Sequence, residues 1–410
     1  MKLTVVALAL LVAGASYVDM ADAAKSSSDY FTTYTTRLGE GALAASNDIK
    51  VDSKDAVLFI IDMQNDFVGE FTYTEDDIAR GLSPCNHTSA CFGVHEGNDT
   101  AEAIAELLAN HTFAGVVATL DDHSPEHCSA SLSDDCTEWL ETGCEGLDDF
   151  HGCVGSTWRS AWAAEDPART MQPFPPHSVR GLVGSHLDAT IQDALRNYAA
   201  RNGSASIAVK GLDITTDSFG ALPYTAATFD FYKKAGLLDP NDPHPAQLIR
   251  SMLTWERRYN ESTGANTFVD SLGLGYVQPP PFGDFVGAGP ANSDLEVKSA
   301  WDVVTGTEGV DSIIVTGLAL DWCVADTALN AKALNPDLNV YIAMDAARPS
   351  FLPMEVCEAI GMVKPKDPSN QIFKGGMSDG SDGCWLHDPA DFAKVMAVAG
   401  IKLITTAQIV

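Results

Sequence analysis

One cysteine in this chain stands where a strand-like run gives way to a helix-like run. Residues 312–316 are apolar and rich in β-branched side chains, which is typical of a buried parallel strand, and helical spacing begins at Val324. Cys323 therefore falls at the start of the predicted helix, where unpaired N–H groups stabilise a nucleophilic thiolate. Taken alone, the stretch favours a buried structural cysteine. Side chains elsewhere in the chain change that interpretation.

Further reactive side chains directly follow the last residues of other predicted strands. They are Asp62, Asp121, His123 and Lys210. The carboxyl ends of parallel strands form the ligand crevice of an open sheet, so these side chains can converge with Cys323. Each alone has an ordinary explanation as a turn, a cap or a solvated charge, and only the joint pattern points to a site. A cysteine nucleophile needs a base and a nearby cation, roles that Asp62 and Lys210 can fill.

The Asp121-x-His123 spacing lets one loop present a carboxylate and an imidazole to a single metal ion. Such a site needs a third ligand, and His177 is the best candidate. Without the other motifs, an ordinary surface loop at Asp121 and His123 is an equal alternative.

The elements that must position these residues alternate between apolar strands and amphipathic helices. This alternation predicts an α/β fold with a doubly wound parallel sheet. The predicted strands span residues 56–61, 115–120, 206–209, 312–316, 338–344 and 401–405. The predicted helices span residues 100–110, 187–200 and 388–399, besides the segment from Val324.

A single domain is predicted over residues 55–410. Its insertions are expected at residues 69–96, 124–172 and 223–293. The last insertion lies between Lys210 and Cys323. We expect it to form a lid or an oligomer contact, or to be a surface elaboration without a catalytic role.

The charge and the N-terminal residues bear on partners and on location. The 410-residue chain carries a formal net charge of −31, which disfavours nucleic acids and anionic membranes as partners. Residues 1–24 have the pattern of a signal peptide, and residues 25–54 read as a polar N-terminal arm on the surface. We therefore expect a protein that is secreted or in an endomembrane lumen, with no membrane association after signal cleavage.

The cysteine count fits an oxidising compartment. Nine cysteines leave at least one thiol unpaired within the chain, and Cys323 is the candidate because it stands at the strand–helix junction. Six of the nine lie between Cys85 and Cys153 without strand or helix periodicity, which predicts disulfide-stapled insertions of unknown pairing. Glycosylation sequons, which fit an extracellular glycoprotein, begin at Asn86, Asn98, Asn110, Asn202 and Asn260.

Taken together, the motifs resemble the nicotinamidase branch of the isochorismatase-like cysteine hydrolases. The matching pieces are DMQNDFV (62–68), ATLDDH (118–123), FPPHSV (174–179), VKGLD (209–213) and TGLALDWCVADTALNA (316–331). They occur in the family's order, the last is highly specific, and they cover the α/β core but not the insertions. The resemblance implies a three-layer α/β/α sandwich around a six-stranded parallel sheet. It also implies hydrolysis of a small amide, nicotinamide, to nicotinate and ammonia.

The resemblance assigns catalytic roles residue by residue. Asp62, Lys210 and Cys323 would be the catalytic triad, with Cys323 forming a thioester with the substrate. A cis peptide between Leu318 and Ala319 would shape an oxyanion hole from the backbone N–H groups of Ala319 and Cys323. Leu318 would also line the substrate site.

The resemblance also assigns a metal and a place for the substrate ring. Asp121, His123 and His177 would bind a divalent ion, usually zinc, with iron or manganese as alternatives, and this ion would hold the pyridine nitrogen. Phe67 and Phe174 would pack against the ring. A homo-oligomer is compatible with these expectations.

The sequence departs from the family's pattern at several positions. Asp122 stands where an aromatic residue is common, Phe174 where tryptophan is frequent, and Ser178 where cysteine often follows the histidine. These departures bear on the substrate more than on the class of catalysis.

Three alternatives follow from the same residues. The nearest is an amidase for another small amide or carbamoyl compound, although those branches generally lack the three metal ligands. An isochorismatase is disfavoured because its reaction uses no nucleophilic cysteine. The third is a secreted binding or effector glycoprotein on an inactive hydrolase scaffold, which the intact triad and ligand set disfavour.

Overall fold

A computed structural model provides the structure of the protein. It describes residues 27–43, 49–69, 72–80, 90, 92–123, 177–180, 182–202, 205–211, 219–237, 276–278, 298–354, 372–375 and 381–410. The predicted signal peptide, insertion 124–172, most of insertion 223–293 and Phe174 lie outside these ranges. Of the two cysteines within them, Cys323 is a free thiol and Cys384 is disulfide-bonded. The predicted stapling of the insertions therefore falls outside the described residues. Across the described helices, none is long and apolar enough to cross a membrane.

A sheet of parallel strands forms the centre of the molecule, as the alternating pattern predicts. Six strands run parallel in the order β11-β7-β6-β1-β2-β3. Their bounds are Ala56–Ile61 (β1), Gly115–Asp121 (β2), Ser206–Lys210 (β3), Ser312–Leu318 (β6), Asn339–Arg348 (β7) and Lys402–Ile404 (β11). Every residue of β1, β2 and β6 is buried, because helices cover both faces of the sheet. The six-stranded parallel sheet is thus confirmed.

The structure extends this sheet beyond the prediction. Two short strands, β4 (Tyr276–Gln278) and β5 (Lys298–Ser299), continue it in antiparallel orientation from β3. β4 belongs to the predicted insertion 223–293, so this part of the insertion is built into the sheet. Three residues are too few for a recognisable period, which is why the sequence pattern missed β4.

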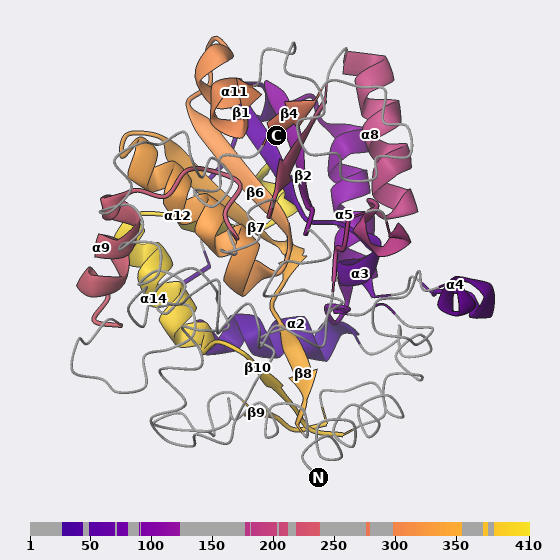
Figure 1. The fold of residues 1–410 in the computed structure, drawn as a ribbon. Coiled ribbons are helices and arrows are strands. Elements are labelled where there is room, and N and C mark those ends of the chain that lie inside the picture. Colours follow the sequence, from indigo (N-terminus) through magenta and orange to yellow (C-terminus); the bar gives the residue numbers. More distant parts are fainter. Residues whose placement is uncertain are drawn as a thin grey trace, which may run out of the picture.

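Helices flank the sheet on two sides (Figure 1). One side carries α5 (Gly97–Asn110) and α8 (Ala189–Asn202), which pack on each other, and the other carries α9 (Ala226–Lys234), α12 (Ala325–Leu334) and α14 (Pro389–Ala399). The other α-helices among the described residues are α2 (Ser27–Arg37), α3 (Asn65–Val68), α4 (Glu75–Ala79) and α11 (Ala300–Gly306). Short 3-10 turns span Ser53–Asp55, Val183–Ser185 and Thr406–Gln408.

The helix α14 shows how local sequence sets these elements. Asp388 accepts a hydrogen bond from the N–H of Ala390 (2.8 Å), and Pro389 begins the helix. Gly400 ends it with a left-handed backbone (φ 74°), a conformation that favours glycine.

A second, smaller sheet was not predicted. It is antiparallel in the order β8-β10-β9, with bounds Phe351–Pro353 (β8), Ile372–Phe373 (β9) and Gly383–Trp385 (β10). Helix α2 packs against it: Tyr30 and Tyr34 are buried, and the Trp385 indole N–H donates to the Tyr30 hydroxyl (3.1 Å). The polar composition of residues 25–54 predicts a surface arm, but the structure buries these tyrosines. The tyrosines on one face of α2 favour packing of the helix against the small sheet, although the rest of the segment is rich in Ser and Thr.

Strand β6 reaches the site because of one glycine. Gly317 has a φ of 108°, and a Cβ there would lie 2.1 Å from the Ile61 carbonyl oxygen. The register between β6 and β7 also shifts beside this residue. Only glycine allows β6 to stay paired with β1 while turning toward the segment that carries Cys323.

Candidate active site

The carboxyl ends of four adjacent strands bring the candidate residues together. Asp62 directly follows β1, Asp121 and Lys210 are the last residues of β2 and β3, and Cys323 lies in the turn after β6. The strand order β6-β1-β2-β3 makes these ends neighbours. Residues distant in sequence therefore share one crevice.

Lys210 is the centre of the group. Its ammonium lies 2.8 Å from Asp62 Oδ2 and 3.6 Å from Cys323 Sγ, and it also donates to Asp121 Oδ1. All four side chains are buried. A buried ammonium would be costly alone, so the surrounding carboxylates are what keep it charged.

Burial and charge set the protonation states of this group. Burial would lower the pKa of Lys210, but Asp121 and Asp62 hold that pKa well above its ordinary value. Burial raises the pKa of Asp62 to about 6, although the Lys210 ammonium lowers it. Burial also raises the pKa of Cys323, with Lys210 acting in the opposite direction and Asp62 adding to the rise. The resting cysteine is therefore a thiol beside a carboxylate that can accept its proton.

Asp62 is fixed by its neighbours on the sheet. The Thr119 hydroxyl donates to Asp62 Oδ1 (2.6 Å) and accepts from the Asp62 N–H (3.0 Å). The Asp62 backbone is left-handed (φ 47°), a conformation that is uncommon outside glycine and that the Gln64 N–H supports by donating to the Asp62 carbonyl (2.8 Å).

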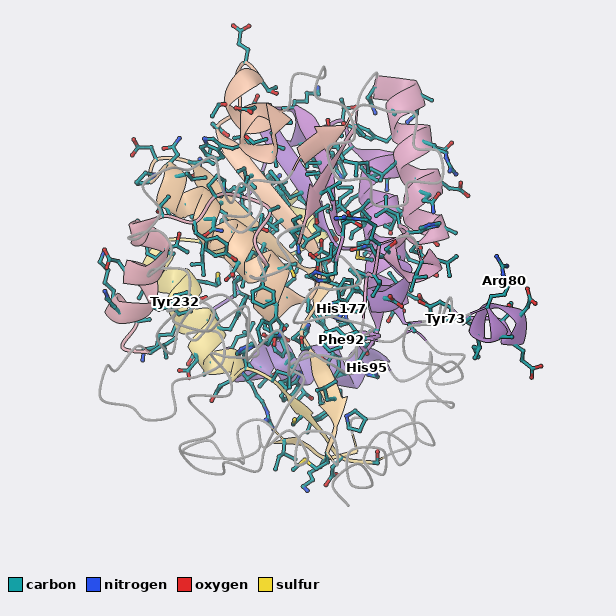
Figure 2. The ribbon with its side chains drawn as sticks, viewed as in Figure 1. Tyr73, Arg80, Phe92, His95, His177 and Tyr232 are labelled. Carbon is teal, nitrogen blue, oxygen red and sulfur yellow. The ribbon has the colours of Figure 1, made fainter. Side chains whose placement is uncertain are left out.

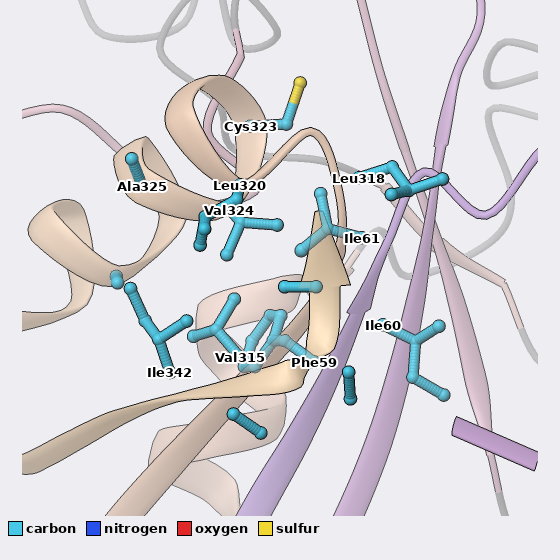
Figure 3. Packing of buried hydrophobic residues seen from close by; sticks show 14 of the residues in the cluster. Phe59, Ile60, Ile61, Val315, Leu318, Leu320, Cys323, Val324, Ala325 and Ile342 are labelled. Carbon is cyan, nitrogen blue, oxygen red and sulfur yellow. The ribbon is translucent and has the colours of Figure 1, made fainter. Parts of the chain in front are cut away.

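Cys323 lies in a π-helical turn, Leu320–Val324, that precedes α12. The N–H groups of Trp322 (3.1 Å) and Val324 (3.2 Å) both donate to the Ala319 carbonyl, and the Leu318–Ala319 peptide is cis, as expected. Figure 3 shows the Cys323 sulfur pointing away from the packed apolar side chains. The predicted simple start of an α-helix is thus a wider turn, a form that often occurs at functional sites.

A candidate metal-binding group adjoins the triad. Ligand atoms of Asp121, His123 and His177 all lie within 4.8 Å of one another, and the three side chains are buried. His123 Nε2 is 3.6 Å from Asp121 Oδ2, while Asp121 Oδ1 faces Lys210. Asp121 therefore belongs both to the candidate metal-binding group and to the cluster around Lys210.

The donor chemistry of this group fits a divalent metal. His123 Nδ1 lies 3.3 Å from the Gly211 carbonyl oxygen. A histidine that donates one ring N–H to a carbonyl leaves its other nitrogen for a metal. Gly211 permits this approach, because a Cβ there would lie 2.9 Å from the His123 ring. Two imidazoles and a carboxylate match the three protein ligands of many catalytic zinc sites.

Two residues that were not singled out from the sequence hold the ligands in place. The side-chain amide of Gln64 donates to the Asp121 carbonyl (2.8 Å) and accepts from the Asp121 N–H (2.9 Å). It thus forms the same pair of hydrogen bonds with the Asp121 backbone that a neighbouring strand would form. The buried Asp66 accepts hydrogen bonds from Ser178 N–H (2.9 Å) and the Tyr73 hydroxyl (2.8 Å). Both belong to the DMQNDFV motif, and their place in this motif is the sequence feature that could have identified them.

Asp122, between the candidate ligands Asp121 and His123, faces another partner. Asp122 accepts a hydrogen bond from Arg180 Nε (2.8 Å). Burial raises the pKa of Asp122, and Arg180 lowers it. Asp122 thus supports the loop that carries His177 rather than the metal group.

Two phenylalanine rings lie beside His177, and one of them, that of Phe92, is labelled next to it in Figure 2. The Phe67 ring centroid is 5.2 Å from that of His177, and Phe92 stacks on His177 at 5.3 Å. Phe92 comes from the end of insertion 69–96, where its N–H donates to the Asp66 carbonyl (3.2 Å). Sequence reasoning missed Phe92 because that insertion has no periodicity.

Comparison with known proteins finds likenesses in three-dimensional structure only. No model of a protein family matches the chain, and no curated protein matches its sequence. Similar solved structures include PnC1 from L. infantum in complex with nicotinate (17% identity; 88% of this chain, 98% of that chain; TM-score 0.40). Others are pyrazinamidase of Pyrococcus horikoshii in complex with zinc (15%; 86% and 99%; 0.35) and N-carbamoylsarcosine amidase from Thermoplasma acidophilum (12%; 86% and 96%; 0.29). Because identities and TM-scores are low, we base the function on this chain's own side chains.

The first prediction concerns metal binding. His177→Ala removes one of the three proposed protein ligands. Loss of a residue that only hydrogen-bonds to a ligand costs about 10- to 100-fold in metal affinity, so the loss of a ligand should lower the affinity for zinc by more than that. Titration calorimetry of the metal-free protein with zinc measures this change. His111→Ala is the matched control, because His111 lies at the other end of the fold, after α5. Equal zinc affinity of the two variants would contradict the assignment.

Proposed function

We propose that the protein is a nicotinamidase-like amidohydrolase that converts nicotinamide to nicotinate and ammonia. The observation that carries this proposal is the placement of Cys323 Sγ 3.6 Å from the Lys210 ammonium, which also contacts Asp62 and the candidate metal ligand Asp121. A thiol, a base and a cation supply nucleophilic catalysis on a carboxamide. The adjoining side chains of Asp121, His123 and His177 would hold a metal ion to which a ring nitrogen can bind.

In the proposed first half-reaction, Asp62 accepts the Cys323 proton and the thiolate attacks the carboxamide carbon. The Lys210 ammonium stabilises the developing thiolate. The backbone N–H groups of Ala319 and Cys323 hold the oxyanion, and one such donor is worth about 3–4 kcal/mol. Asp62, now protonated, returns the proton to the departing nitrogen, so ammonia leaves and a thioester remains on Cys323.

In the second half-reaction, Asp62 takes a proton from water and the water oxygen attacks the thioester. The carbon–sulfur bond breaks, the proton on Asp62 returns to Cys323, and the product leaves as nicotinate after losing the second water proton to solvent, where ammonia takes it up. Each atom of the substrate and of water is thereby accounted for.

Asp121, His123 and His177 would hold a divalent ion, zinc in the first place. When bound, this ion would hold the pyridine nitrogen and withdraw electron density from the carboxamide. Phe67 and Phe92, which lie against His177, would flank the ring together with Phe174 and Leu318.

The second prediction tests the activity and its nucleophile. Purified protein should release ammonia from nicotinamide, and Cys323→Ala should lower kcat by at least about 1,000-fold while metal content stays near wild type. A variant that loads metal and remains active would point instead to attack by metal-bound hydroxide.

Benzamide, which lacks the ring nitrogen, is the matched control substrate. A lower kcat/KM for benzamide than for nicotinamide is expected. Equal values would favour an amidase of broader substrate class, and no ammonia from any small carboxamide would favour an inactive scaffold.

The third prediction follows from the raised pKa of Asp62. As pH falls through about 6, the carboxylate becomes protonated and can no longer accept the thiol proton, so kcat/KM should fall. An acid limb near an ordinary aspartate's pKa would contradict this. Histidine ligands also protonate in acid, so metal content measured at each pH separates metal loss from the titration of Asp62.

A further inference from the structure

A segment beside the site runs along the helix that follows Cys323. Residues 219–228, here called the α12 clamp, include the first residues of the predicted insertion 223–293 and lead into α9. The packing of α9 on α12 is visible in Figure 1. The start of the insertion is buried core rather than a lid, since Tyr224 and Thr228 are each almost fully inaccessible to solvent.

The contact nearest to the nucleophile passes through Thr327. Its hydroxyl donates to the Cys323 carbonyl (2.7 Å) and accepts from the Ala221 N–H (3.0 Å). A threonine bond to the carbonyl four residues back is common in helices and alone means little. Here the same hydroxyl also binds a second segment, so the Cys323 peptide is tied to the α12 clamp.

A second contact lies one residue earlier on the helix. The Tyr224 hydroxyl donates to Asp326 Oδ2 (2.5 Å) and accepts from the Gly220 N–H (2.9 Å). Asp326 is completely buried; burial raises its pKa to about 7, against the effect of the Tyr224 hydrogen bond. Two buried side chains in the first turn of α12 are thus held by one clamp.

Further along α12 the clamp is fixed by an amide. Asn330 Nδ2 donates to the Leu222 carbonyl (2.8 Å), and Asn330 Oδ1 accepts from the Thr228 hydroxyl (3.0 Å). The approach is close: a Cβ at Gly220 would lie 2.5 Å from Asn330 Nδ2. The clamp and the helix are therefore tightly packed on each other.

On its other side the nucleophile turn is anchored at Ala319, whose carbonyl accepts from Trp322 and Val324. Cys323 thus sits between two fixed points. Its sulfur is 3.6 Å from Lys210, a distance at which a small rotation of the Cys323 peptide changes the interaction.

We propose that Thr327 is a positioning residue that, through the α12 clamp, fixes the Cys323 sulfur against Lys210. This inference rests on the proposed function only for the role of the sulfur as nucleophile. It makes the start of the insertion part of the apparatus that presents the thiol.

The test measures thiol reactivity without any substrate. Wild type, Thr327→Val and Thr327→Ser are treated with iodoacetamide at one fixed pH, and labelling of the Cys323 peptide is followed by mass spectrometry. Valine keeps the shape but removes the hydroxyl, so labelling should slow by about fivefold to tenfold, the effect of one lost hydrogen bond. Serine keeps the hydroxyl and should restore the rate to within about twofold of wild type.

Thr100→Val is the matched control. It removes another buried threonine hydroxyl that donates to the carbonyl four residues back, that of Glu96 (3.3 Å), but in α5, on the side of the sheet away from α12. It should lower Tm and leave labelling at the wild-type rate. If Thr327→Val lowers Tm without slowing labelling, or if both variants slow labelling equally, the hydroxyl has only a structural role and the proposal is overturned.

Enzyme kinetics separate this proposal from the proposed function. With nicotinamide, Thr327→Val should lower kcat and leave KM nearly unchanged. Slowed labelling in a protein that hydrolyses no amide would uphold the role of Thr327 and refute the proposed activity. Absence of Cys323 labelling in wild type would overturn both.

Discussion

A buried, charged lysine is the interaction on which the rest of this site depends. Lys210 contacts Asp62, Asp121 and Cys323, and these partners hold its pKa well above the ordinary value although burial alone would lower it. Removing either carboxylate would leave the buried ammonium with a single anionic partner. The ammonium that would stabilise a thiolate also fixes one oxygen of Asp121, so the proposed nucleophile and the candidate metal-binding group share a partner.

The sheet explains why such a cluster could be anticipated from sequence. Residues at the ends of strands converge when the strands are parallel and adjacent, and the apolar runs before Asp62, Asp121, Lys210 and Cys323 are long enough to be recognised. The six parallel strands and the cis peptide after Leu318 followed the predictions. The roles of the individual side chains remain proposals.

What escaped prediction depends on contacts between segments. Phe92 reaches His177 because backbone hydrogen bonds attach an aperiodic insertion to the residues after β1. The sequence of helix α2 indicates a polar arm, but in the structure its tyrosines pack against Trp385, which is remote in sequence. The sequence does not distinguish Thr327 from other helical threonines, because the hydrogen bond from the Ala221 N–H to its hydroxyl is a tertiary contact. Such partners are set by tertiary packing, which no local period encodes.

The most direct test of the account is to trap the acyl-enzyme. Protein mixed with excess nicotinamide is quenched with acid during the first turnovers and mapped by peptide mass spectrometry. We predict one nicotinoyl group on Cys323, since that thiol is the group that Lys210 and Asp62 surround. Turnover that leaves the nicotinoyl group on another residue, or on none, would contradict the account.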